Sequence, residues 1–495
     1  NRNRPYYEDE ILIMKKLTVI MILLVIIVTY AYGQQEKVVL TIWDYKIAQS
    51  KYLDNEIKLF QEKYPYIKIN RIKQVQRKYL DLILFAARSD TLPDLYCPCK
   101  SDIVDDVTQH WCIPLDKWAT SEWKKRFPKG SFAEGVHTFQ GKTYLIPFEQ
   151  PYVWHQVYVN RKVFRDAGLT DKDGNVLHPK TWAEFRKFAK IITQKSKGKV
   201  FGLGMALRTP PGLFPHMFYE WARGAGAAGG DFAEKFEMDY RIGKYNLDHP
   251  AYVKLMKFLL SIKKDGSIIT NFMSLDDETL KVKFAEGEVG MILGGIWNQT
   301  GWEITHPGWL DYDCIPAPAP DEKGYRCLQC VSPEVQQASY FISKNCKNPD
   351  EAWLFLDWLA TPEAGARFVR SGNGQSVFPQ ANSRENAKTE QFAQFLDICR
   401  TYLRWAPNPI ARNPNLALVK WATGEELMPS RTQVFHGIMS GQIKEKDIPA
   451  MFKKLNNAYN AALEASMREI KEKGYQVDMN DLIFPDWNPL ENYGT

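Results

Sequence analysis

Apolar and polar positions along the first hundred residues predict strands and helices in alternation. The predicted strands are residues 38–43, 67–72 and 93–96, and the predicted helices between them are 51–64 and 79–89. The first helix shows the reasoning, since Leu53, Ile57 and Phe60 recur at helical spacing and Pro65 stops the pattern. The first strand is β-branched and apolar throughout, as expected for a buried strand.

The same alternation returns downstream. Thr181 followed by Glu184 is a capping box, which predicts a helix start at this point. Further predicted helices are 250–265, 275–285, 350–359 and 448–473, and further predicted strands are 199–205 and 289–293. Strands that alternate with helices predict an α/β fold in which a parallel sheet is covered by helices on both faces.

The N-terminal region has the pattern of an export signal. Met14-Lys15-Lys16 is a short basic start, residues 17–28 are almost wholly apolar, and Ala31 and Gly33 supply the small residues that a signal peptidase needs. We expect cleavage before Gln34, and the alternative is an uncleaved anchor. No cysteine follows the apolar run, so a lipoprotein anchor is not expected. Residues 1–13 are acidic rather than basic, and we interpret them as an upstream extension that is not native.

Composition restricts the function only loosely. The 495 residues are enough for two or three domains. The 64 basic and 58 acidic residues are interspersed, so no charged arm indicates a nucleic-acid partner. Phosphate-binding, serine-hydrolase and zinc-protease motifs are not found, and no catalytic residue is proposed.

Eight cysteines follow the proposed cleavage site. They are Cys97, Cys99, Cys112, Cys314, Cys327, Cys330, Cys346 and Cys399. An even number in an exported chain is compatible with disulfides, but the sequence does not fix their pairing. The simplest hypotheses are Cys97 or Cys99 with Cys112, and Cys314 with Cys327 or Cys330. A zinc or redox site is the alternative, although neither short Cys pair has a second, properly spaced ligand pair.

Several ordered motifs together carry a resemblance to a known family. They are Gly141-Lys142-Thr143-Tyr144-Leu145-Ile146-Pro147, Tyr158-Val159-Asn160-Arg161, Ala167-Gly168-Leu169, Pro179-Lys180-Thr181-Trp182, residues 284–297, Ile315-Pro316-Ala317-Pro318 and residues 352–363. In this order and spacing the chain resembles the extracellular solute-binding proteins of the maltodextrin-binding type, from about Val38 to the last helix. The eight cysteines depart from the family pattern.

The resemblance implies a fold and a domain plan. The expected fold is the two-lobe periplasmic-binding-protein fold, type II and maltose-binding-like, with three interlobe crossings and a ligand cleft. The expected lobes are 34–146 plus 316–363 and 150–312 plus 370–495, with crossings near 146–151, 312–318 and 362–372. Closure about these crossings would bury the ligand.

The resemblance also implies a function without chemistry. We expect a periplasmic or extracytoplasmic binding component of an ABC transporter that carries a sugar, most readily an oligosaccharide, to the permease as a monomer, with no cofactor, metal or nucleic acid. Sugar sites combine flat aromatic faces with planar polar groups. The candidate ligand contacts are Trp43, Asp44, Tyr45, Tyr96, Lys100, Glu149, Tyr152, Trp154, His216, Trp221, Gly295, Trp297, Asn373 and Trp405. We expect Trp182, Trp353 and Trp358 to be structural instead.

Three alternatives stay open at this point. The chain could be a secreted carbohydrate-active enzyme, since 58 acidic residues always allow some carboxylate pair. It could serve a sensor kinase or chemoreceptor instead of a permease. Its solute could also be a polyol or a phosphorylated glycerol compound, although no Arg and Lys cluster occurs among the candidate contacts, which disfavours an anion.

Overall fold

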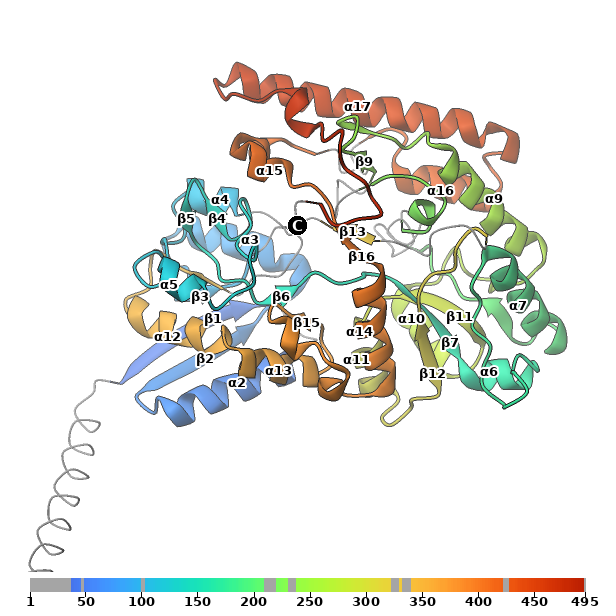
Figure 1. The fold of residues 1–495 in the computed structure, drawn as a ribbon, viewed down its shortest axis with the longest axis horizontal. Helices are drawn as coiled ribbons and strands as arrows, with labels where there is room; N and C mark the ends of the chain where they lie inside the picture. The colour runs from blue at the N-terminus through green and yellow to red at the C-terminus, as the bar shows by residue number, and fades with distance from the viewer. Residues whose placement is uncertain are drawn as a thin grey trace, which may run out of the picture.

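The computed structural model describes most of the chain as one elongated molecule built around two four-stranded sheets (Figure 1). The described residues are 37–45, 49–98, 103–208, 220–229, 237–321, 329–331, 340–421 and 427–493. The expected signal peptide and upstream extension therefore lie outside the described residues. Within the described ranges, no helix is both long and apolar enough to cross a membrane.

The first sheet has the strand order β14-β3-β1-β2. Its strands are β1 (Val38–Asp44), β2 (Ile67–Lys73), β3 (Leu95–Tyr96) and β14 (Phe341–Ile342). The three strands predicted from the first hundred residues are confirmed, and β1 is parallel to both β2 and β3. β14 joins antiparallel to β3 from far along the chain.

Helices cover this sheet. They are α2 (Ser50–Lys63), α3 (Gln76–Arg88), α12 (Pro349–Leu359) and α13 (Pro362–Arg370), with the short α4 (Val104–Thr108) and α5 (Ser121–Lys124) and the hairpin β4 (Thr138–Phe139) and β5 (Lys142–Thr143) nearby. α2 buries Leu53, Ile57 and Phe60, the stripe that the sequence pattern predicts. Trp353 is buried as expected, and Trp358 donates from Nε1 to Glu56 at 2.9 Å.

The second sheet has the strand order β12-β7-β11-β8. Its strands are β7 (Gln156–Asn160), β8 (Phe201–Leu203), β11 (Val289–Gly294) and β12 (Tyr312–Ile315). Its helices are α6 (Arg161–Asp166), α7 (Trp182–Lys195), α9 (Pro250–Lys264), α10 (Asp277–Ala285) and α11 (Trp297–Thr305). The capping box of Thr181 and Glu184 is confirmed at the start of α7. Trp182 is buried, donates to Pro318 O at 3.1 Å and is structural as expected.

The expectation of purely parallel sheets was wrong. β11 is parallel to β8, but β7 is antiparallel to both β11 and β12. The physical reason is that β7 enters this sheet directly from the link between the two sheets, without a covering helix to return the chain. β14 is antiparallel in the first sheet for a related reason, because the chain reaches it only after it has passed through the second sheet.

A two-stranded ribbon links the two halves. β6 (Glu149–Gln150) pairs antiparallel with β15 (Gln375–Ser376), and Figure 1 shows both strands between the two sheets. β6 lies within the crossing expected at 146–151. Most of the stretch 362–372, where a crossing was expected, is occupied by α13. This helix packs on α2, and its Ala364 O accepts a hydrogen bond from Tyr52 Oη. The chain therefore leaves the first half after α13.

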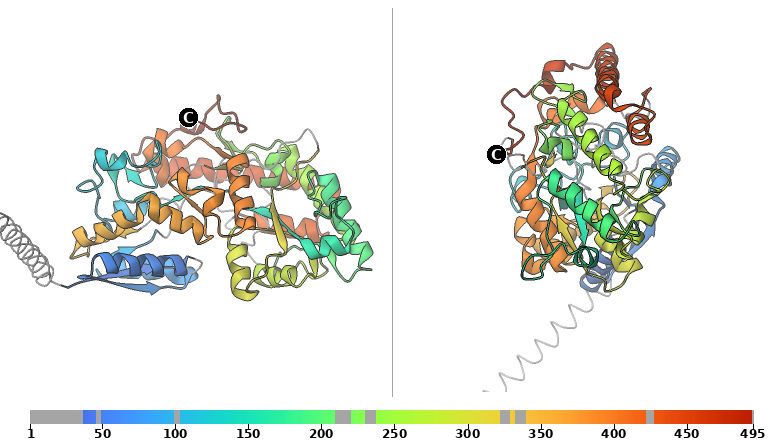
Figure 2. Two further views of the ribbon diagram at one scale, coloured as in Figure 1. Left: turned by 60° about the horizontal axis from the view of Figure 1, so that its bottom comes forward. Right: turned by 90° about the vertical axis from the view of Figure 1, so that its right-hand side faces the viewer.

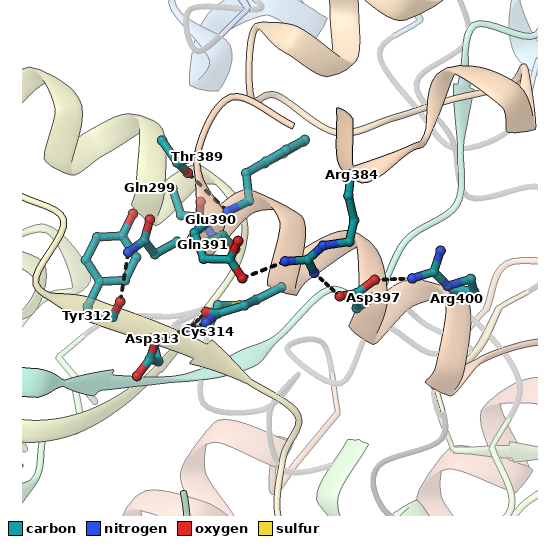
Figure 3. A network of polar contacts seen from close by, with 12 residues as sticks. Gln299, Tyr312, Asp313, Cys314, Arg384, Thr389, Glu390, Gln391, Asp397 and Arg400 are labelled. Carbon is teal, nitrogen blue, oxygen red and sulfur yellow. Dashed lines mark hydrogen bonds and ion pairs between the residues drawn. The ribbon is translucent and has the colours of Figure 1, made fainter. Parts of the chain in front are cut away.

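The chain then docks on the second sheet through α14 (Glu390–Tyr402). Gln391 donates to the backbone of Leu310 and Tyr312, and Arg384 pairs with Glu390 and Asp397 (Figure 3). Beside this contact Gln394 donates to Asp313 at 3.0 Å. Burial alone would raise the pKa of Asp313, but hydrogen bonds from His178, Arg161 and Gln394 hold it below its ordinary range.

The last part of the chain packs mainly against the second half. Its elements are β16 (Leu403–Trp405), which pairs with β13 (Gln329–Val331), then α15 (Pro409–Arg412), α16 (Arg431–Ser440) and α17 (Ile448–Glu472). The long helix predicted at 448–473 is confirmed, and it holds the hairpin of β9 (Met238–Asp239) and β10 (Lys244–Tyr245) through Asn460. Figure 2 shows the blue N-terminal elements and the green middle elements at opposite ends of the long axis.

A buried ion pair fixes the end of β1 to β2. The Asp44 carboxylate is fully buried and accepts two hydrogen bonds from Arg71, at 2.7 and 2.8 Å, and one from Tyr340 Oη at 2.8 Å. Only 4% of the Arg71 side chain is exposed. Because Tyr340 immediately precedes β14, this one carboxylate holds three segments of the first sheet together.

The cysteine hypotheses are corrected by the structure. Cys97, Cys112, Cys314, Cys346 and Cys399 form no disulfide, so Cys97 is not bonded to Cys112 and Cys314 is not bonded to Cys327 or Cys330. All except Cys346 are buried, and burial raises the pKa of the Cys314 and Cys399 thiols well above its usual value. They pack as small apolar side chains. Cys99 and Cys327 lie outside the described residues.

Removing Arg71 should destabilise the protein strongly. The change Arg71→Ala leaves the Asp44 carboxylate buried without its cation, which costs about 3–5 kcal/mol of unfolding free energy. Urea unfolding followed by circular dichroism measures this. The matched control is Lys162→Ala, which removes an exposed pair with Asp166 in α6 and should cost no more than about 0.5 kcal/mol. Equal losses in the two variants would contradict the role given to the buried pair.

The free thiols should react only after unfolding. We expect at least the five described thiols to be alkylated by iodoacetamide in denaturant without any reductant, as counted by mass spectrometry. The folded protein should react far more slowly, because buried thiols of raised pKa carry little thiolate. Recovery of a disulfide-linked peptide containing Cys97 with Cys112, or Cys314 with another cysteine, would contradict the structure.

Candidate functional site

Four rings gather where the chain enters the second sheet. Tyr152, Trp154 and His155 come from the segment between β6 and β7, and Trp297 is the first residue of α11. The ring centroid of Trp297 lies 5.7 Å from that of Trp154 and 5.7 Å from that of His155. Tyr152 and Trp154 are nearly parallel, at 6.2 Å. Both indoles are only partly buried, so this aromatic cluster reaches the surface of the described structure.

The glycines before Trp297 position its ring. β11 ends at Gly294, and the carbonyl of Gly295 accepts a hydrogen bond from Tyr158 Oη at 2.9 Å. A Cβ atom on Gly295 would overlap the six-membered ring of Trp297. The indole can therefore fold back over the turn only because residue 295 has no side chain.

Glu149 lies on the ribbon between the two halves. Its carboxylate is buried and accepts a hydrogen bond from Gln49 Nε2 at 2.5 Å. Burial is the main cause that raises the pKa of neighbouring Tyr152 well above its usual value, and Glu149 adds to it, so this hydroxyl stays a neutral donor. A carboxylate, an amide and a phenol thus lie together at the link.

A cavity of about 640 Å³ opens beside this ribbon. Its walls come from the first half (128–131 and His137), the link (Pro147, 149–151, Val377 and Pro379) and the C-terminal part (Trp405, Ala406, Asn408, Ala411, Arg412, Phe484 and Tyr493). Glu149 and Gln150 line it from the link, and Trp405, Phe484 and Tyr493 contribute aromatic rings. Segments remote in sequence therefore converge on one cavity.

The cavity wall is basic at two places. Lys129 and Arg412 both line it, and no carboxylate of the described residues lies within ion-pair distance of either. His137 contributes no charge at neutral pH, because burial lowers its pKa to about 3. Two cations from different segments therefore line this cavity, and neither was among the predicted contacts.

Three predicted contacts are buried in the described structure. Asp44 is fully buried against Arg71, and Tyr96 is fully buried with its hydroxyl donating to Asp106 at 3.0 Å. Trp221 packs on Phe185 and Phe258 inside the second half. All three follow or flank strands and helices, so the sequence pattern could not separate a side chain aimed at the core from one aimed at the cleft.

The remaining predicted residues are divided between the aromatic cluster, the cavity and other places. Trp43 lies near the end of β1 and Tyr45 directly follows that strand. Tyr45 packs on Tyr79 at 5.0 Å with its hydroxyl toward Pro98 O. Asn373 lies before β15 and donates to Ser371 Oγ at 2.6 Å, outside the cavity lining. Lys100 and His216 lie outside the described residues.

Sequence reasoning missed several residues at the site. They are Lys129, His137, His155, Arg412, Phe484 and Tyr493. His155 could have been found, since it directly follows Trp154 in a segment already predicted to line the cleft. The others stand in loops, in the single turn of α15 or after the last long helix, where no periodic pattern indicates which way a side chain points.

The arrangement suits reversible binding. Flat rings beside carboxylate, amide and guanidinium groups can contact both the apolar faces and the hydroxyl groups of a polar solute. In the described part of the chain, no group of three or more His, Cys, Asp or Glu side chains is placed to hold a metal ion.

Comparisons with known proteins agree with this geometry. A putative binding protein of Brucella abortus (strain 2308) is 24% identical over 364 residues, which cover 73% of this chain and 80% of that protein. The solved GacH receptor of Streptomyces glaucescens, described with acarbose, superposes with a TM-score of 0.62 at 16% identity, over 87% of this chain and 99% of that one. The maltose/maltodextrin-binding domain MalE of Bdellovibrio bacteriovorus, bound to maltotriose, gives a TM-score of 0.58 at 18% identity, over 88% and 100%.

These likenesses confirm the two-lobe fold expected from the sequence motifs. A family model described as bacterial extracellular solute-binding protein matches residues 45–366, well over half of the chain. The chain therefore belongs to the bacterial extracellular solute-binding protein family.

Proposed function

We propose that this protein is the extracytoplasmic substrate-binding component of an ABC transporter and that it captures an oligosaccharide between its two lobes. The observation that carries the proposal is the cavity of about 640 Å³ beside the β6–β15 ribbon, lined by three aromatic rings and by Glu149, Gln150 and Asn408. Its volume lies within the range of about 300–1,000 Å³ usual for small-molecule sites.

Pyranose chemistry matches these walls. A sugar ring presents an apolar C–H face that covers an indole or phenol ring, while its hydroxyls need hydrogen-bond partners when water is removed. Trp405 and Tyr493 offer such faces in the cavity, and Trp154 and Trp297 offer further ones in the aromatic cluster. Membership of the solute-binding family and the sugar ligands named for its structural neighbours support the same solute class.

The lobe arrangement supports a role in transport. The short strands β6 and β15 link the lobes, so we expect a hinge movement about them to enclose a bound ligand. We propose that the closed, monomeric form docks on the permease with one face of each lobe, after export through the cleaved signal at residues 14–33. Lobe boundaries near 34–146 plus 316–363 and 150–312 plus 370–495 remain part of this proposal.

An acidic sugar or another anionic solute is the second candidate. Lys129 and Arg412 line the cavity, and neither is within ion-pair distance of a described carboxylate. A carboxylate or phosphate group on the solute would be attracted to both cations. This alternative keeps the transport role and changes only the ligand class.

Thermal unfolding against a ligand panel tests the proposal. We expect residues 34–495 to melt at a higher temperature with at least one of maltotriose, raffinose, acarbose and a uronic-acid oligosaccharide. A ligand present at about 100 times its Kd adds about 2.7 kcal/mol of stability. A shift with neutral sugars supports the first candidate, and a shift confined to the acidic one supports the second. No shift with any of them, or hydrolysis of the ligand during incubation, would contradict capture of a sugar without chemistry.

Displacing the Trp297 indole should weaken that binding. Gly295→Ala places a methyl group where the indole now lies, so we expect Kd for the strongest ligand of the panel to rise by roughly tenfold, as for Trp297→Ala. Isothermal titration calorimetry measures this. The control is Gly301→Ala on α11, where a Cβ atom meets nothing within 4 Å and affinity should stay unchanged. Wild-type affinity in the Gly295→Ala variant would place Trp297 outside the site.

A further inference from the structure

The chain after α17 returns to the cavity as an anchored segment, residues 483–493, here called the C-terminal segment. Figure 1 shows it in dark red, descending from α17 toward β16. It is fixed to the second lobe near its start, because Phe484 N donates to Tyr240 O at 2.6 Å and Trp487 packs, almost fully buried, on the Tyr240 ring. It is therefore part of the packed structure.

The same segment is fastened to the strand that carries Trp405. Trp405 N donates to Asn492 Oδ1 at 3.0 Å, and Tyr493 N donates back to Trp405 O at 3.0 Å. Arg404 adds a hydrogen bond to Leu490 O at 2.8 Å. These bonds fix Tyr493 beside Trp405, and both side chains line the cavity.

Arg412 and Phe484 support Tyr493 from behind. The Arg412 guanidinium lies 3.5 Å from the centre of the Phe484 ring and donates to Ile483 O at 2.6 Å. Phe484 in turn meets the Tyr493 ring edge-on, at 5.5 Å between centroids. A cation, a buried ring and a partly exposed ring thus form a stack that ends at the cavity.

The loop and the helix that follow β16 also contact the first lobe. Asn408 Nδ2 donates to Glu134 O at 3.4 Å, and the Ile410 side chain lies so close to Gly135 that a Cβ atom there would be 2.7 Å away. The wall that includes Tyr493 is therefore held by both lobes and not by the tail alone. It lies beyond residue 366, where the family match ends.

We propose that the C-terminal segment is a ligand-binding element of this protein and that Tyr493 contacts the solute as a flat platform next to Trp405. This inference rests on the proposed function and adds a specificity-determining residue outside the matched family region. The Tyr493 ring supplies the flat face that contacts the solute. The backbone hydrogen bond from Tyr493 N to Trp405 O sets the position of this ring, and the Phe484 ring, packed against Arg412, sets its tilt. Solutes that lack an apolar face gain no affinity from the cavity wall formed by Tyr493 and Trp405.

Substitutions at Tyr493 separate ligand contact from a structural role. We expect Tyr493→Ala to raise the Kd of maltotriose, or of whichever panel sugar binds the wild type best, by roughly tenfold. Tyr493→Leu keeps apolar contact with Phe484 but removes the flat face, so it should lose affinity similarly, whereas Tyr493→Phe should stay within about threefold. Calorimetry gives Kd, and the melting temperature without ligand should be nearly unchanged because Tyr493 is partly exposed.

The matched control is Tyr475→Ala, a tyrosine just after α17 that is 44% exposed and does not line the cavity. It should bind with wild-type affinity. If Tyr493→Ala and Tyr493→Leu also bind like the wild type, the inference is wrong while the proposed function stands. If the wild type binds none of the panel sugars, the proposed function fails and this inference fails with it.

Discussion

The whole arrangement depends on a very short piece of backbone pairing. Two residues of β6 and two residues of β15 form the ribbon between two independently built sheets. Buried apolar residues of both sheets and of the link form one continuous core around it. The ribbon decides where the halves meet, and the buried Glu149, the Tyr152 ring and the cavity all lie at that meeting point. Small changes in a few backbone torsions here translate into large movements of the side chains that surround a solute.

Local pattern was enough to find most of the elements. β1, β2, β3 and β11, and the helices α2, α7, α9, α10, α12 and α17, could be predicted because apolar spacing, caps and proline act within one or two turns of chain. Strand direction could not be predicted in the same way. β7 and β14 are antiparallel to their neighbours because of where the chain passes from one lobe to the other. The periodicity of apolar residues does not reveal that passage.

The same limit applies to the residues of the candidate site. Glu149, Tyr152, Trp154 and Trp297 were proposed because motifs place them at a link or at a strand end. Glu149 lies in the cavity wall and the other three in the aromatic cluster, and their contact with a ligand stays a prediction. Asp44 and Tyr96 also stand at strand ends, but their side chains are buried. The alternation of side chains along a strand defines two faces of the sheet but does not show which face is buried. Phe484 and Tyr493 could not be found, because only the packing of the last segment on Tyr240 and Trp405 brings them back to the site.

β14 is synthesised long after the other strands of the first sheet, which affects when this sheet can be completed in a newly made chain. Tyr96 on β3 pairs with Phe341, and α12 and α13, which cover the same half, follow later still. A ribosome adds about 5–20 residues per second, so the first sheet waits on the order of tens of seconds for its edge strand and its covering helices. Through that interval Asp44 lacks Tyr340, and the faces of α2 that pack on α12 and α13 are bare. The contacts that complete the N-terminal half therefore become available only after most of the polypeptide has been synthesised.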